Sequence, residues 1–158
     1  MWTLWEQVVF WFLQARSLWR LQRLPRLQWD LPTRFTKTAS GDNWLILNTV
    51  QDQNKELIIG FVSPAQLAIM KSSPTWYCDG TFDCVLAIEF VNQVWIIVAN
   101  TPVGVSVPVA FFLTERRTED TYQQILTTLR DKYGVTGPKT LLCDFEKVSR
   151  NFIVIIEA

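Results

Sequence analysis

Histidine is absent from this sequence of 158 residues. Its absence excludes serine and cysteine hydrolases that use a histidine base, and it excludes zinc sites with histidine ligands. It also removes the side chain whose unperturbed pKa lies nearest to neutral pH. Any catalysis by this chain must therefore rest on carboxylates, hydroxyls or the few cysteines.

Cysteine is scarce, because Cys78, Cys84 and Cys143 are the only three in the chain. No two of them have the CxxC spacing of zinc knuckles and thioredoxin-like sites. An odd, sparse set without a recognisable secretory signal favours a reducing compartment. We therefore expect an intracellular protein that is not secreted.

Excess charge of one sign is also missing, since 15 lysines and arginines balance 15 aspartates and glutamates. This balance gives no electrostatic indication of nucleic-acid binding, which draws on basic side chains to neutralise phosphates. About half of the chain is hydrophobic, at 49%, which argues against disorder. The length suits one domain with a sizeable core.

The first zone, residues 1–34, is rich in tryptophan and arginine and has no clean periodicity. Its apolar run, residues 8–13, is too short to cross a bilayer, which takes roughly 20 residues. We expect a segment appended to the domain, outside its core. The alternative is a basic amphipathic helix on a membrane surface within residues 2–26, which we rank last.

The second zone, residues 35–74, predicts a β-hairpin followed by a short helix. Residues 45–47 and 57–62 are β-rich runs separated by a polar turn. Ser63 can cap the helix that follows, with a proline at the first helical position, and Gln66 completes a capping box.

The third zone, residues 75–151, contains four further β-rich runs. The expected strands are residues 76–82, 94–99, 103–113 and 140–144. The second of them is an unbroken apolar run, which indicates burial on both faces of a sheet. The third alternates with a period of two and contains Pro108, which is typical of an edge strand.

A helix is expected between the third and fourth of these strands. Thr118 can cap it, acidic residues fill its first turn, and Gly134 ends it. Its apolar side chains recur at the spacing of one helical face. They are Tyr122, Ile125, Leu126, Leu129 and Tyr133.

The order of these elements predicts an α/β fold with a mixed sheet. Three sequential strands form a meander, and the helix then acts as a crossover that returns the fourth strand to the sheet. Because the third strand is expected at an edge, the fourth should lie beside the first, parallel to it. This is the topology of a ribonuclease H-like sheet.

Two carboxylates would meet in that topology. Asp79 lies on the first strand of the third zone, and Asp144 ends the fourth. Adjacent strands are about 4.8 Å apart, so matched registers bring both side chains to one spot. Each residue taken alone favours a turn or a helix cap. Together they predict a Mg²⁺ or Mn²⁺ site, because hard oxygen ligands suit those cations.

Four segments of the third zone carry a resemblance to a known family. They read TWYCDGTF (75–82), VPVAFFLT (107–114), RTEDTY (117–122) and LCDFEK (142–147). In this order and spacing, with 65 residues from Asp79 to Asp144 (144 minus 79), they resemble the MULE-type transposase domain of Mutator-like elements. The resemblance covers residues 75–151, about half of the chain.

The resemblance implies a ribonuclease H-like fold with a DDE/D triad, in which Asp79 and Asp144 are the first two catalytic acids and metal ligands. It implies Mg²⁺ or Mn²⁺ and no small-molecule cofactor, DNA as partner, a nuclear location and the option of homo-oligomers. Glu146 suits the solvated first turn of a helix. Cys78 and Cys143 precede the two aspartates and should point into the core.

Part of the chain departs from the family. Residues 152–158 do not match it, and Glu157 follows Asp144 by only 13 residues, too close to be the third acid. We therefore expect an incomplete catalytic domain, a truncated transposase that is inactive alone. The alternative is a domesticated, non-enzymatic fragment that binds DNA or protein.

Overall fold

The computed structural model of the protein describes residues 31–52, 54–81 and 90–143. Several sequence predictions lie outside the described residues. They concern residues 1–30, Cys84, Asp144, the helical turn expected at Glu146 and the tail 152–158.

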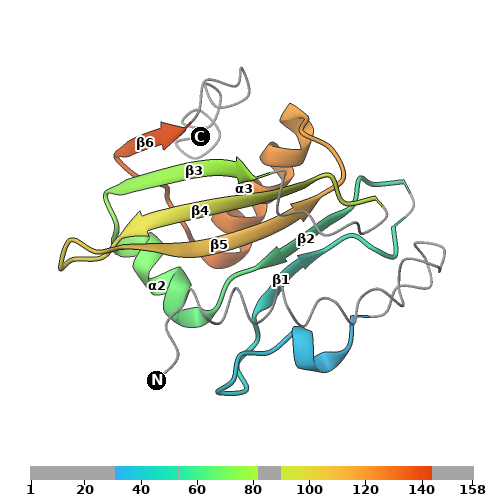
Figure 1. The fold of residues 1–158 in the computed structure, drawn as a ribbon, viewed down its shortest axis with the longest axis horizontal. Helices are drawn as coiled ribbons and strands as arrows, with labels where there is room; N and C mark the ends of the chain where they lie inside the picture. The colour runs from blue at the N-terminus through green and yellow to red at the C-terminus, as the bar shows by residue number, and fades with distance from the viewer. Residues whose placement is uncertain (1–30, 53, 82–89, 144–158) are drawn as a thin grey trace.

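The described chain forms one mixed sheet of six strands, flanked by two α-helices (Figure 1). The strands are β1 (Leu45–Asn48), β2 (Ile58–Phe61), β3 (Thr75–Thr81), β4 (Gln93–Asn100), β5 (Ser106–Thr114) and β6 (Thr140–Cys143). The helices are α2 (Pro64–Ser72) and α3 (Glu119–Tyr133), with a short 3₁₀ helix, η3 (Thr33–Phe35), before β1. The strand order is β1-β2-β5-β4-β3-β6.

The second half of the chain has the predicted connectivity. β3, β4 and β5 pair in sequence as an antiparallel meander. The chain then passes through α3 and returns as β6, which pairs with β3 in parallel. The α/β class, the meander, the crossover helix and the parallel fourth strand are therefore confirmed.

The prediction that β5 is an edge strand was wrong. β2 pairs with the half of β5 from Phe111 to Thr114, which extends the sheet beyond the meander. Pro108 lies in the other half, where β5 pairs only with β4 and where the register shifts between Ile97 and Val98. A proline is tolerated at such an irregularity because no ladder hydrogen bond from its nitrogen is required.

The predicted start of β5 was also too early. Val103 and Val105 belong to the turn between β4 and β5, in which Thr101 and Val105 are hydrogen-bonded to each other. Gly104 adopts a positive φ there, which a glycine accommodates without strain. The apolar alternation therefore begins in the glycine-containing turn before β5, so it does not mark the first residue of the strand.

The N-terminal hairpin joins the same sheet through a close contact between backbone and ring. β1 and β2 pair as predicted, and Gly60 of β2 lies opposite Phe112 of β5. A Cβ atom at Gly60 would lie 2.7 Å from the Phe112 ring and 3.2 Å from the Cβ of Leu47. The absence of a side chain at this position lets the ring pack directly on β2.

The predicted capping box of α2 is present. The Ser63 hydroxyl accepts from the Gln66 amide, while the Gln66 side-chain oxygen accepts from the Ser63 amide. The Gln66 side chain, itself buried, also donates to the carbonyl of Pro108 at 3.2 Å. Gln66 therefore completes the cap of the helix and also attaches the helix to the half of β5 that does not pair with β2.

The predicted limits of α3 are confirmed as well. Thr118 caps its first turn, and Gly134 ends it in the left-handed conformation. Tyr122 donates from its hydroxyl to the side-chain oxygen of Gln93, a fully buried residue at the start of β4. At the other end of the helix, the Tyr133 hydroxyl donates to the carbonyl of Ile46 in β1.

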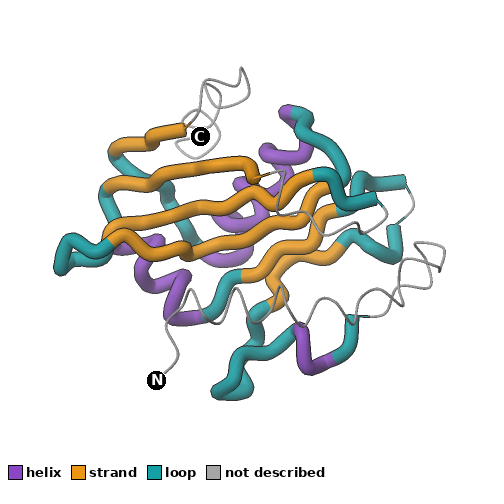
Figure 2. Tube along the Cα trace, in the orientation of Figure 1, coloured by secondary structure: helices purple, strands orange, loops and turns teal. Residues whose placement is uncertain are grey.

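The sheet has apolar side chains on both faces. α2 and α3 cover one face, where the larger cluster lies (Figure 2). On the other face, a smaller cluster extends over β2, β5 and β4, where Trp44 packs on Phe61 with ring centroids 5.0 Å apart. The predicted burial of β4 between two layers agrees with this arrangement. None of the helices among the described residues has both the length and the apolar character needed to cross a membrane.

Candidate functional site

Asp79 lies near the middle of β3, on the face of the sheet away from the helices. Its neighbour Cys78 packs in the helix-covered core, and successive side chains of a strand point to opposite faces. Asp79 is exposed, and none of the described residues provides it with an ion-pair partner. Its carboxylate oxygens are therefore accessible to a ligand.

The register between β3 and β6 bears directly on the second predicted acid. Each of the four residue pairs between these strands, from Thr75 with Thr140 to Cys78 with Cys143, has an offset of 65 residues. The aspartates at 79 and 144 have the same offset. The structure therefore brings together the residues that immediately precede the two acids, and Asp144 itself lies outside the described residues.

The two cysteines that precede the acids point to the opposite face, as predicted. Cys78 is buried, and Cys143 is half-buried and packs against the same core. Burial raises the pKa of the Cys78 thiol far above its ordinary value, and the charge of the nearby Cys143 raises it further. The Cys78 thiol is thus neutral at neutral pH. Both sulfur atoms are turned away from Asp79, so soft sulfur ligands do not join the carboxylate.

Exposed side chains lie on the same face of the sheet as Asp79, toward the start of β3. Tyr77 and Leu142 are paired across β3 and β6 and remain 37% and 50% exposed. The amide of Asn100 donates to the Tyr77 hydroxyl at 3.5 Å, and Ser106 donates to the Asn100 side-chain oxygen at 2.7 Å. Along β3, this face therefore carries neutral polar groups and an aromatic ring at the start of the strand and the Asp79 carboxylate further along it.

A complete metal centre is not formed by the described residues. Among them, no three cysteine, aspartate or glutamate side chains converge on one point. Asp79 is the one predicted ligand that the structure places. Its hard oxygen donors fit Mg²⁺ or Mn²⁺ better than zinc.

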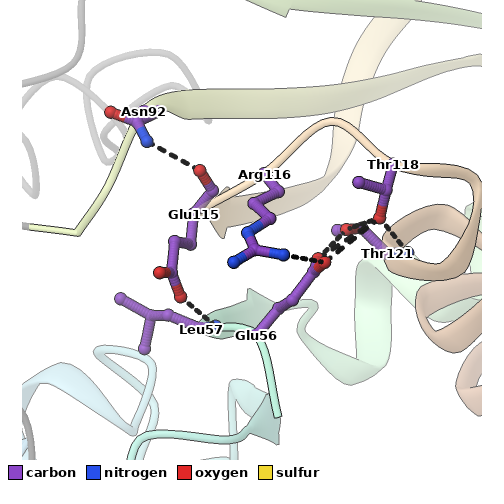
Figure 3. Close-up of polar contacts among 7 residues, drawn as sticks. All are labelled: Glu56, Leu57, Asn92, Glu115, Arg116, Thr118 and Thr121. Carbon is purple, nitrogen blue, oxygen red and sulfur yellow. Dashed lines mark hydrogen bonds and ion pairs between the residues drawn. The ribbon is translucent and has the colours of Figure 1, made fainter.

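Sequence reasoning missed a different acidic residue, Glu56, which precedes β2 (Figure 3). Its carboxylate accepts hydrogen bonds from the hydroxyls of Thr118 and Thr121 at the start of α3. The Arg116 guanidinium lies 3.6 Å from the same carboxylate. A negative charge at a helix N-terminus is stabilised by the unpaired amides of the first turn.

A second glutamate reinforces this junction. Glu115 accepts from the backbone amide of Leu57 at 3.0 Å, and Asn92 donates to the Glu115 carbonyl at 2.7 Å (Figure 3). The first contact joins the hairpin to the end of β5, and the second joins the start of β4 to it. Both span long sequence separations, so no local pattern reveals them. Their geometry is that of a structural clamp, since the carboxylates already accept from protein donors.

Comparison of the chain with protein-family models, with curated proteins and with solved structures finds no match.

Proposed function

We propose that this chain carries the first part of a ribonuclease H-like catalytic core related to MULE-type transposases. Asp79 and Asp144 are its first two metal-binding acids. The proposal rests on one observation above the others: β3 and β6 are parallel neighbours with an offset of 65 residues. Continued by a single residue, that register pairs the two aspartates.

The connectivity of the sheet supports the same proposal. A three-stranded meander, a crossover helix and a strand parallel to the first form the arrangement that the ribonuclease H-like reading requires. Each motif of the resemblance that lies within the described residues falls at a corresponding element. TWYCDGT coincides with β3, VPVAFFLT lies in β5, and RTEDTY begins α3.

The chemistry of the donors suits a divalent cation. Two neighbouring carboxylates repel each other when both are ionised, and Mg²⁺ or Mn²⁺ removes that cost. A cation held there supplies the charge stabilisation that phosphodiester cleavage needs. Asp79 contributes an exposed carboxylate on β3, a strand that pairs with β4 on one side and with β6 on the other, and the buried Cys78 beside it anchors the backbone.

We expect little strand cleavage from these 158 residues alone, because they contain no third acid at the position that the family uses. The assay is nicking of supercoiled DNA in Mg²⁺ and in Mn²⁺. Robust metal-dependent nicking that disappears in Asp79→Asn would show that the chain is active on its own and would overturn the expectation of inactivity.

Metal binding provides the direct test of the two acids. In a calorimetric Mn²⁺ titration, Asp79→Asn and Asp144→Asn should each weaken binding about tenfold or more, as loss of metal-site partners does. Asp131→Asn is the matched control, because Asp131 is exposed and lies on α3. Equal affinities in all four proteins would refute the proposed site.

A non-enzymatic binding fragment is the second candidate. It is favoured by the exposed apolar side chains of Val103 and Val105 in the turn between β4 and β5, which are 84% and 55% exposed. Such a fragment should be folded and monodisperse without metal, as measured by near-UV circular dichroism and size-exclusion chromatography. If Val103→Ser reduces binding to DNA or to a protein partner while Asp79→Asn does not, this candidate replaces the first.

A further inference from the structure

Cys78 and Cys143 are register partners on neighbouring strands, and both side chains face the helix-covered core. They occupy matched positions on the parallel strands β3 and β6, so their side chains leave the sheet on the same face. Both are free thiols in this structure.

The backbone spacing is suitable for a disulfide. Adjacent strands lie about 4.8 Å apart, within the range of about 4.4–6.8 Å between the Cα atoms of disulfide-bonded cysteines. Because the two Cβ vectors are roughly parallel, the Cβ atoms are also separated by about 4.8 Å, somewhat more than the usual value of about 3.8 Å. Bond formation therefore needs a small inward movement and leaves some strain.

β6 is the element that can make this movement. It is four residues long and lies at the end of the sheet, where its only strand partner among the described residues is β3. β3, in contrast, is held on its other side by six residue pairs with β4. A shift of β6 toward β3 disturbs few other contacts.

We propose that Cys78 and Cys143 form a reversible disulfide across β3 and β6 when a low-molecular-weight disulfide, such as oxidised glutathione, serves as the oxidant. Cys143 is the point of entry because it is half-buried, while Cys78 is buried. The strain of a bond between neighbouring strands makes such a disulfide easier to reduce than a structural one. The proposal is independent of the proposed transposase function.

The exchange proceeds in two balanced steps. The Cys143 thiolate attacks one sulfur of oxidised glutathione, whose S–S bond breaks and releases one glutathione thiolate. Cys78 then loses its proton to solvent and attacks the Cys143 sulfur, which releases the second glutathione. Two protein thiols are oxidised, and one glutathione disulfide is reduced to two thiols. The second step is the slower one, because Cys78 is buried.

The experiment uses the full chain with Cys84→Ser, which removes the one remaining cysteine. The folded variant is incubated with oxidised glutathione, alkylated, and analysed by intact-mass and peptide mass spectrometry. We expect the loss of two hydrogen atoms, one peptide that joins Cys78 to Cys143, and full reversal by excess reduced glutathione. With Cys78→Ala added, the reaction should stop at a single glutathione on Cys143.

A third variant keeps the result interpretable if Cys78→Ala does not fold. In Cys84→Ser with Cys143→Ala, Cys78 should remain reduced, since it is buried and has lost its partner. Near-UV circular dichroism checks the fold of each protein. The proposal is wrong if folded Cys84→Ser retains two thiols that can be alkylated, or if it accumulates glutathione on both cysteines without a cross-link.

Discussion

The two edges of the sheet are built differently. At the β1–β2 edge, side chains fix the hairpin at several points: the Glu56 carboxylate binds the start of α3, Tyr133 donates to β1, and Phe112 packs on Gly60. At the β6 edge, four backbone pairs hold a short strand, and Tyr77 and Leu142 remain exposed. One edge uses its polar groups for structure, whereas the other leaves a carboxylate accessible.

This difference separates the residues that stabilise the fold from those available for chemistry. Glu56 and Glu115 near the β1–β2 edge already accept hydrogen bonds from protein donors, so they are poor candidates for ligand binding. Asp79 on β3 has an accessible carboxylate, and the preceding residue, Cys78, is paired with Cys143, which precedes a second aspartate. We therefore expect substitutions at the first edge to change stability and those at the second to change ligand binding.

The largest effect should come from the contact between Phe112 and Gly60. Phe112→Ala removes a fully buried ring and should lower the free energy of unfolding by about 3–5 kcal/mol. Gly60→Ala forces that ring to move and should cost about 1–3 kcal/mol. Urea denaturation of both variants and the double variant gives the coupling energy.

The double variant provides the control for this contact. Gly60→Ala should cost clearly less when Phe112 is already alanine, because the ring atoms 2.7 Å from its Cβ are gone and the contact with Leu47 at 3.2 Å is less severe. Strict additivity of the two changes would contradict the packing described here.

A smaller loss should follow removal of the Glu56 carboxylate. Glu56→Ala removes the carboxylate that accepts from the hydroxyls of Thr118 and Thr121 and should cost about 1–3 kcal/mol. Glu56→Gln, which retains a side-chain oxygen, should cost less. The control is Asp131→Asn on the exposed face of α3, and an equal loss in Glu56→Ala and the control would argue against the clamp.

The smallest stability effects should occur at the β6 edge. Asp79→Asn and Leu142→Lys change exposed side chains and should alter the free energy of unfolding by less than about 0.5 kcal/mol. Urea denaturation in metal-free buffer measures both. A loss comparable to that of Glu56→Ala would mean that this edge also serves the fold, and the contrast between the edges would disappear.

Local patterns accounted for the second half of the fold. The cap at Thr118 and the terminating Gly134 define α3 with neighbouring residues alone, and the order of strands and helix limits where β6 can pair. The parallel pairing of β6 with β3 was predicted from the premise that β5 is an edge. That premise was wrong, yet β2 occupies the other side of β5 and leaves β3 as the partner.

Contacts between distant segments could not be predicted in the same way. The bonds from Thr118 and Thr121 to Glu56 span 62 and 65 residues, and nothing local at Glu56 marks it as a helix-capping acid. The packing of Phe112 on Gly60 likewise depends on the docking of the hairpin. Asp79 could be identified because the sequence motif that contains it coincides with a strand, β3. The position of Asp144 stays a prediction.

Paramagnetic broadening by Mn²⁺, observed in amide NMR spectra, tests the central claim most directly. Substoichiometric Mn²⁺ should broaden first the amide signals of Cys78, Gly80, Leu142 and Cys143, the residues adjoining Asp79 on β3 and near the end of β6. Asp79→Asn should abolish this pattern. Broadening centred elsewhere, for example on the acidic first turn of α3, or a pattern unchanged by Asp79→Asn, would contradict the proposed site.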